Sequence, residues 1–221
     1  MRRKYPLVVG NIYHILNKSI AGYQIFNQPR DYTRFLRMLD FFSFADMPTQ
    51  FGELTRKIES NQKDFDLALR DLIQNKEKRI SLIAYCVMPT HIHLAIKEIR
   101  KNGITKFMGD LTNSYSKYFN PKHKRQGPLW SGPFKNIPVE TDEQLLHLTR
   151  YVHLNPVTAG LVDKPEDWPA SSYHEYLDAD TPHRCEFKKL ISLSPAAYSK
   201  FVTDRIFYQR ELAKIKFLLP N

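Results

Sequence analysis

The run Ile80–Glu98, ISLIAYCVMPTHIHLAIKE, constrains the fold more than any other part of the chain. It consists of two apolar, strand-like stretches separated by Met88-Pro89-Thr90. Proline has no N–H to donate to a strand ladder, so Pro89 belongs at the turn of a hairpin or at the start of a strand. We therefore expect two consecutive strands here, and any helices must pack against the sheet that contains them.

The segments on either side alternate between strand and helix patterns. Residues 8–16 are rich in β-branched and aromatic types, which predicts a strand. Apolar residues with helical spacing predict amphipathic helices over Asp31–Phe42 and Ile104–Phe119. Thr141-Asp142-Glu143-Gln144 has the pattern of a capping box, and we expect the helix that it starts to end near Asn155-Pro156. This order predicts an α+β fold with an antiparallel sheet.

The length of 221 residues fits one domain with an appendage. We place the main domain at residues 1–178, with a polar insertion at about 47–79. A C-terminal extension would occupy 179–221 and contain a helix over 196–218.

The charge is strongly positive and unevenly placed. The chain has 33 Lys and Arg residues, 23 Asp and Glu residues and a formal net charge of +10, which indicates an anionic partner. Between Arg100 and Lys135 the only acid is Asp110, a distribution that favours phosphate binding over an evenly solvated surface. No segment has the length of a membrane span or the pattern of a signal peptide, so we expect a cytoplasmic protein without a membrane partner.

His91 and His93 are the first candidate functional residues. Residues i and i+2 of a strand point to the same face, so both imidazoles could reach one metal ion. The alternative is two unconnected histidines on a sheet. Two polar groups inside an apolar strand need partners, however, and a shared metal ion would satisfy both.

Tyr151 and Asn155 are the second pair. On a helix, residues i and i+4 lie one above the other, so the phenol and the amide share a face. The alternative is that Tyr151 is a core residue on the buried stripe of this helix. Two neutral imidazoles and an amide oxygen would suit Mg²⁺ or Mn²⁺ held jointly with a substrate phosphate. Beside such an ion, a tyrosine could act as a nucleophile towards phosphorus.

Three stretches of the sequence together resemble one family. MPTHIHLAIKE resembles the HUH motif (His, hydrophobe, His) of the single-tyrosine transposases. LLHLTRYVHLNPVTAGLV, followed by WPASSY, is similar to the tyrosine helix of the REP-associated tyrosine transposase branch. NSYSKYFN and HKRQGPLWSGPFK resemble that branch's segment between the two motifs. The similarity runs from about Asn11 to Tyr176.

The resemblance implies a fold, a site and a reaction. The fold would be a ferredoxin-like antiparallel sheet with helices on one face. His91 and His93 would bind Mg²⁺ or Mn²⁺, Asn155 would be a third ligand where insertion-sequence relatives tend to carry Gln, and Tyr151 would be the nucleophile. The reaction would be cleavage and rejoining of single-stranded DNA, often near a hairpin or a repetitive palindromic element, through a 5′-phosphotyrosine. The resemblance leaves both a monomer and a homodimer open.

Further residues are expected to support this chemistry. His147 lies one helical turn before Tyr151 and could be an accessory residue or an ordinary surface histidine. Tyr115 and Tyr118 are rival nucleophiles, but their stripe predicts a core position. The expected DNA contacts are mostly basic: Lys117, Lys122, Lys124, Arg125, Trp130 and Lys135. The Trp130 ring could stack on unpaired bases, but the alternative, a large aromatic residue that packs within the fold, is the more common one.

Two alternatives to a transposase stay open at this point. The chain could be a regulatory protein that binds single-stranded or hairpin DNA on the same fold without turnover. It could also be a replication-initiator or relaxase-type nickase, which shares the chemistry but usually has a longer chain with a helicase or a second tyrosine.

Overall fold

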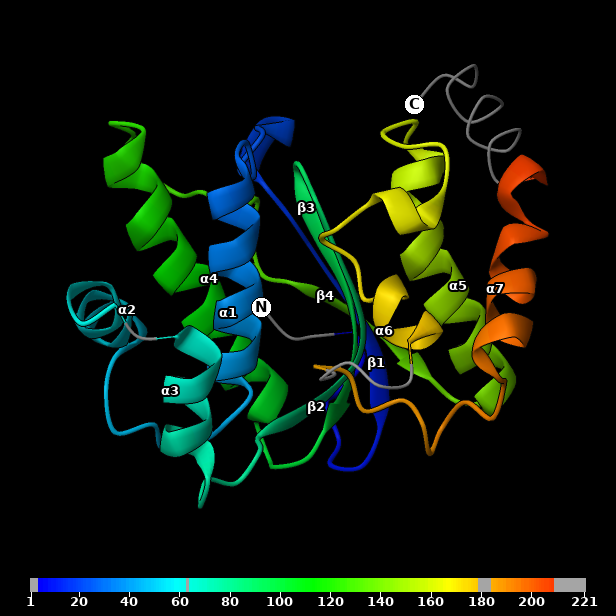
Figure 1. Ribbon diagram of the computed structural model, residues 1–221, viewed down its shortest axis with the longest axis horizontal. Helices are drawn as coiled ribbons and strands as arrows, with labels where there is room; N and C mark the ends of the chain where they lie inside the picture. Colours follow the sequence, from blue (N-terminus) through cyan, green and yellow to red (C-terminus); the bar gives the residue numbers. More distant parts are fainter. Residues whose placement is uncertain (1–3, 63, 179–183, 209–221) are drawn as a thin grey trace.

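A computed structural model describes residues 4–62, 64–178 and 184–208 (Figure 1). Its elements follow the order β1 (Ile12–Lys18), η1 (Ile20–Gly22), α1 (Pro29–Phe42), α2 (Phe51–Ser60), α3 (Phe65–Ile73), β2 (Ile80–Met88), β3 (His91–Glu98), α4 (Gly103–Lys122), β4 (Lys135–Val139), α5 (Asp142–Thr158), η2 (Pro165–Asp167), α6 (Tyr173–Leu177) and α7 (Pro195–Thr203).

The four strands form one antiparallel sheet in the order β2-β3-β1-β4. β2 and β3 are the predicted consecutive strands, and Pro89 and Thr90 form the turn between the paired residues Met88 and His91. The predicted first strand over 8–16 is displaced towards the C-terminus, because the backbone turns at Gly10, whose φ of 90° favours glycine. The α+β class with an antiparallel sheet is confirmed.

Helices cover both faces of this sheet (Figure 1). α1 and α4 lie on one face, as the resemblance implies, whereas α5, α6 and α7 lie on the other. The prediction of helices on one face is therefore wrong for the C-terminal half of the chain. The reason lies in β2, where every residue from Ile80 to Met88 is buried, so that a single layer of helices could not cover it.

The polar segment at about 47–79 contains α2 and α3. Arg34 and Arg37 of α1 hold these helices by cation–π contacts: the Arg34 guanidinium lies 5.1 Å from the ring centre of Phe51, and that of Arg37 lies 4.8 Å from Phe65. Arg34 and Arg37 thus contribute to packing. The bounds of the insertion stay a prediction.

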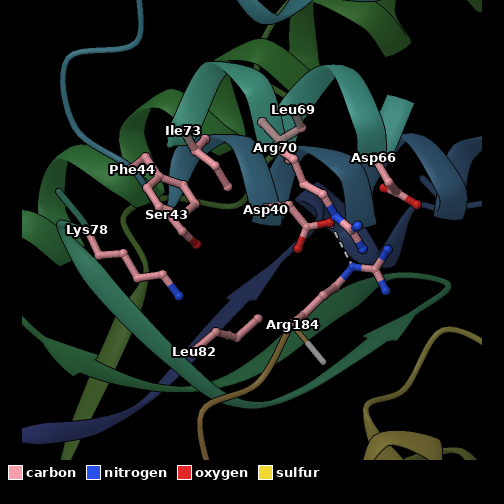
Figure 2. A pocket seen from close by; sticks show the side chains of 10 residues that line it. All are labelled: Asp40, Ser43, Phe44, Asp66, Leu69, Arg70, Ile73, Lys78, Leu82 and Arg184. Carbon is pink, nitrogen blue, oxygen red and sulfur yellow. Dashed lines mark hydrogen bonds and ion pairs between the residues drawn. The ribbon is translucent and has the colours of Figure 1, made fainter. Parts of the chain in front are cut away.

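Side chains within residues 184–208 contact α1 and α5. Arg184 donates to Asp40 of α1 at 2.8 Å, in a pocket that α3 and β2 also line (Figure 2). Tyr198 of α7 is buried and bonds to His153 of α5 at 2.8 Å. The helix predicted over 196–218 begins at Pro195 and breaks after Thr203. Its residues 209–218 lie outside the described part, and a division at residue 178 stays a prediction.

None of the helices in the described ranges is both long and apolar enough to cross a membrane.

Candidate active site

The two histidines of β3 share one face of the sheet, as their spacing predicts. Their ring centres are 5.0 Å apart, and His93 is 3% exposed. Each ring uses its Nδ1 atom in a hydrogen bond. The His91 Nδ1 lies 2.9 Å from the Thr90 hydroxyl, and the His93 Nδ1 lies 3.0 Å from Nε2 of His14 on the neighbouring strand β1. The two Nε2 atoms therefore remain for a ligand.

Tyr151 of α5 lies against His93 of its own chain. Its ring is edge-on to His93, with centres 5.4 Å apart, and to His14, with centres 5.8 Å apart. The side chain is 43% exposed. The reading of Tyr151 as a core residue is therefore wrong, and its ring is open to a substrate.

Tyr151 is carried by helix α5, and capping hydrogen bonds fix where this helix starts. The Thr141 hydroxyl accepts from the Gln144 amide at 3.1 Å, and the Gln144 side chain accepts from the Glu140 amide at 2.8 Å. The predicted end near Asn155-Pro156 is too early, because Pro156 sits in the last turn and the helix continues to Thr158. The φ angle of proline is compatible with a helix, and the missing N–H of Pro156 removes one backbone hydrogen bond.

Asn155 lies one turn beyond Tyr151, as predicted. Its Nδ2 donates to the Tyr151 carbonyl at 2.8 Å, which leaves the amide oxygen as the remaining polar atom. Burial raises the pKa of the Tyr151 phenol, and hydrogen bonding with the Asn155 side chain partly opposes this rise. The phenol is therefore protonated at neutral pH and requires activation.

The imidazoles of this cluster are neutral at physiological pH. Burial lowers the pKa of His91 to about 4 and that of His93 to about 2, and His14 is lowered to about 4 for the same reason. Lys18 adds to this effect, because its positive charge opposes protonation of both His91 and His93. Neutral imidazoles have a free lone pair, which is the form that binds metal ions.

The donor types of His91, His93 and Asn155 suit a divalent ion that a substrate phosphate could share. His91, His93 and the amide oxygen of Asn155 would supply three donors and leave positions open for phosphate oxygens. Across the ranges that the structure describes, no group of three or more His, Cys, Asp and Glu side chains is placed to hold a metal ion. The proposed donor set is compatible with this, because it has only two members of those types.

Two residues at the site escaped the sequence analysis. His14 and Lys18 both lie on β1, and the register that places Lys18 opposite His91 joins residues far apart in the chain. The available signal was a histidine inside the strand-like segment NIYHILNK, since a polar residue on a buried strand needs a partner. That signal does not identify the partner.

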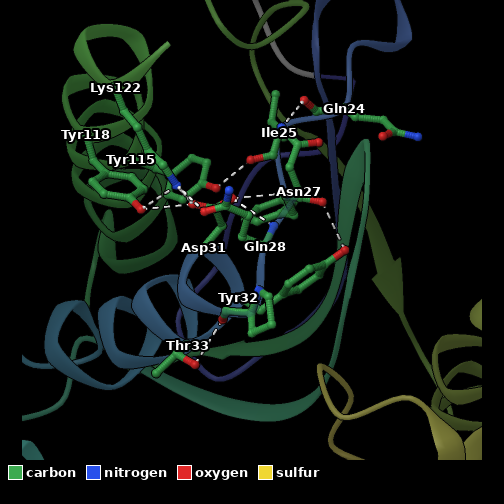
Figure 3. A network of polar contacts seen from close by, with 12 residues as sticks. Gln24, Ile25, Asn27, Gln28, Asp31, Tyr32, Thr33, Tyr115, Tyr118 and Lys122 are labelled. Atoms are coloured by element: carbon green, nitrogen blue, oxygen red, sulfur yellow. Dashed lines mark hydrogen bonds and ion pairs between the residues drawn. The ribbon is translucent and has the colours of Figure 1, made fainter.

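Several of the predicted DNA contacts have structural roles. The Lys122 ammonium lies 2.6 Å from the buried carboxylate of Asp31 and also bonds to Tyr118 (Figure 3). Arg125 donates to the carbonyls of Gly127 and Pro128.

Trp130 is only 9% exposed, and its Nε1 donates to the Thr112 carbonyl at 3.2 Å. The ring therefore packs against α4, which favours the packed alternative, and a DNA contact by Trp130 stays a prediction. Lys117, Lys124 and Lys135 are exposed.

His147 and the two rival tyrosines, Tyr115 and Tyr118, make their contacts with other parts of the protein. The His147 Nδ1 lies 2.8 Å from Arg150, and its ring packs on Phe201, so these contacts lead to the C-terminal segment. An accessory role for His147 stays a prediction. Tyr115 is buried and donates to the Ile25 carbonyl at 2.6 Å, and Tyr118 bonds to Asp31. Both contacts support the core reading of these tyrosines.

Comparisons relate part of this chain to known proteins. Residues 56–155 match the family model described as "Transposase IS200 like", a stretch that contains both histidines of β3, Tyr151 and Asn155. This part of the chain is therefore similar to that class of transposases. More particularly, the chain is 28% identical over 109 residues to a REP-associated tyrosine transposase of Haemophilus influenzae, a match that covers 44% of this chain and 61% of that protein.

A solved structure shares the fold. It is a REP-associated tyrosine transposase bound to a REP hairpin, with a TM-score of 0.56 and 13% identity over 82% of this chain and 88% of that one. The resemblance to the REP-associated branch is confirmed.

Proposed function

We propose that this protein is a single-tyrosine transposase that cleaves and rejoins single-stranded DNA through a 5′-phosphotyrosine. The contact between the half-exposed ring of Tyr151 and His93 of the same chain carries this proposal. It brings a nucleophile to a pair of neutral imidazoles, as a metal-assisted phosphoryl transfer requires. It also supports a tyrosine that serves its own subunit.

The reaction consists of two exchanges at one phosphorus atom. The Tyr151 oxygen attacks the phosphorus, the bond to the 3′ oxygen breaks, and the 5′ phosphate stays on the tyrosine. The phenol proton passes to water, and the leaving 3′ oxygen takes up a proton. In the second exchange a 3′ hydroxyl from another DNA end attacks the same phosphorus and loses its proton to water, the bond to the Tyr151 oxygen breaks, and that oxygen takes up a proton. The phosphodiester bond is conserved, so no nucleotide cofactor is needed.

A divalent ion, Mg²⁺ or Mn²⁺, held by His91, His93 and Asn155 would polarise the phosphate and stabilise the leaving oxygen. The Asn155 side chain is itself positioned beside Tyr151, because its Nδ2 donates to the Tyr151 carbonyl. Lys18 is exposed and lies opposite His91 in the sheet, where it can contact a phosphate that approaches the histidines.

We propose hairpin-forming single-stranded DNA as the substrate. The support is the solved relative, which is bound to a REP hairpin, together with the exposed Lys117, Lys124 and Lys135 on α4, the following loop and β4. Exposed lysines bind the phosphate backbone in any sequence, so they would position the DNA without selecting it.

The test is covalent capture of DNA. Labelled hairpin-bearing strands from the host's repetitive sequences are incubated with the protein and Mn²⁺, and an adduct that survives SDS is measured. We expect an adduct with the wild type and none with Tyr151→Phe. Tyr23→Phe is the matched control, because Tyr23 is similarly exposed, at 46%, and should form the adduct normally. Binding without any adduct would favour the regulatory DNA-binding protein instead.

A further inference from the structure

His14 is placed where it can control one of the two histidines of β3. Its Nε2 lies 3.0 Å from the His93 Nδ1, and the two rings are nearly parallel, with centres 5.2 Å apart and planes inclined by 17°. Strand β1 fixes this contact, because Leu16 pairs with His93 and His14 pairs with Ala95, so His14 is the diagonal neighbour of His93.

A hydrogen bond between two neutral imidazoles contains one proton, and its position determines what His93 can do. If His14 donated, His93 would carry its own proton on Nε2 and could not bind a metal ion there. If His93 donates from Nδ1, its Nε2 lone pair is free. Only the second arrangement is compatible with His93 as a ligand.

We propose that His14 is a positioning residue that accepts the Nδ1 proton of His93 and thereby holds the His93 Nε2 lone pair towards the divalent ion. This inference rests on the proposed function, which places the ion at His91 and His93. Thr90 does the same for His91, since its hydroxyl oxygen lies 2.9 Å from the His91 Nδ1. Both ligands then present the same nitrogen to one ion.

His14 acts through His93 and does not bind the ion itself. Its Nε2 is occupied by the bond to His93. In the part of the chain with described coordinates, no triad of His, Cys, Asp and Glu side chains is arranged to hold a metal, and a third imidazole ligand would complete such a triad.

The acceptor in this bond, His14, is uncharged, which is favourable next to an anionic DNA substrate. Ligand histidines commonly donate to a carboxylate, which raises the basicity of the imidazole. A carboxylate at position 14 would place a negative charge beside the ring of Tyr151, whose centre is 5.8 Å from that of His14, and would repel the DNA phosphate. An imidazole accepts the same proton without adding charge.

Two substitutions separate this role from simple packing. His14→Phe keeps an aromatic ring but has no acceptor, whereas His14→Gln loses the ring but offers a carbonyl oxygen. We measure Mn²⁺ affinity by isothermal titration calorimetry and folding by circular dichroism. We expect His14→Phe to weaken Mn²⁺ binding about ten- to a hundredfold and His14→Gln to remain within about threefold of the wild type. Wild-type affinity in His14→Phe would overturn the proposal.

A second measurement needs no variant. Long-range ¹H–¹⁵N spectra of the metal-free wild type give the tautomer of each histidine, and we expect the proton of His93 on Nδ1. Finding it on Nε2 would overturn the proposal, as would a metal-induced shift of a His14 nitrogen in the Zn²⁺-loaded protein. A wild type that binds neither metal would contradict the proposed function, while the tautomer of His93 would still decide the role of His14.

Discussion

The five basic residues predicted to contact DNA, which lie on α4, the following loop and β4, divide into two groups that should differ in their effect on DNA binding. Lys117, Lys124 and Lys135 are exposed, whereas Lys122 and Arg125 bond to the protein itself. Neutralising the first three with glutamine should weaken binding of single-stranded DNA. It should also lower the slope of log K against log salt by about 2, because each lost phosphate contact removes about 0.7.

The matched control is Lys122→Gln, which removes one positive charge from the same region. The Lys122 ammonium lies 2.6 Å from Asp31, whose side chain is fully buried. We expect the salt slope to stay unchanged and the free energy of unfolding to fall by about 2 kcal/mol, because the buried carboxylate loses a charged donor but keeps its other hydrogen bonds.

Fluorescence anisotropy with a labelled hairpin strand, between about 50 and 200 mM salt, gives the slope. Urea unfolding gives the stability of each variant. The reasoning is refuted if the triple variant keeps the wild-type slope. It is also refuted if Lys122→Gln lowers the slope by about 0.7 without loss of stability.

Three further results are expected. Tyr151→Phe should bind hairpin DNA within about twofold of the wild type while forming no adduct, because only the reacting oxygen is lost; a normal adduct would place the nucleophile elsewhere. His91→Ala or His93→Ala should lose Mn²⁺ binding and cleavage together, whereas Asn155→Ala should be milder because water can replace a neutral oxygen ligand; normal cleavage by all three in EDTA would contradict the metal site. Burial raises the pKa of Asp40 to about 6, above its unfolded value, so its contribution to stability is present at low pH and lost as pH rises through 6. Urea unfolding should show about 1 kcal/mol less stability at pH 7 than at pH 5 from this group, and Asp40→Asn should remove that difference.

Patterns that are local in the sequence predicted the central part of the fold and of the candidate site. The two strands around Pro89 and the capped helix from Thr141 follow from residues that are neighbours in the chain. The same holds for the shared face of His91 and His93, which depends only on the alternation of a strand. Their approach to Tyr151 depended on the resemblance, because no local pattern relates β3 to α5.

Features that depend on long-range register or burial were missed or misjudged. His14 and Lys18 reach the site through the pairing of β1 with β3, which periodicity alone does not determine. The charge distribution predicted that Lys122 and Arg125 contact DNA. In the structure, both cations bond to other groups of the protein. The sequence likewise left open whether the Trp130 ring is available to DNA or packed, because a sequence does not show which ring is covered, and the structure shows this ring to be 9% exposed.

The buried contact between α5 and the C-terminal segment has a mechanical consequence. His153 of α5 is fully buried and bonds to Tyr198 of α7 on one side and to the Ser172 hydroxyl on the other, each at 2.8 Å. Ser172 in turn accepts from the amide of Tyr85 on β2 at 2.9 Å. During the proposed reaction a DNA strand is attached covalently to Tyr151, two residues away, so any pull on that strand acts on α5. The bonds of His153 oppose rotation of the helix under such a load and keep the loaded tyrosine in line with the histidines while the second DNA end arrives.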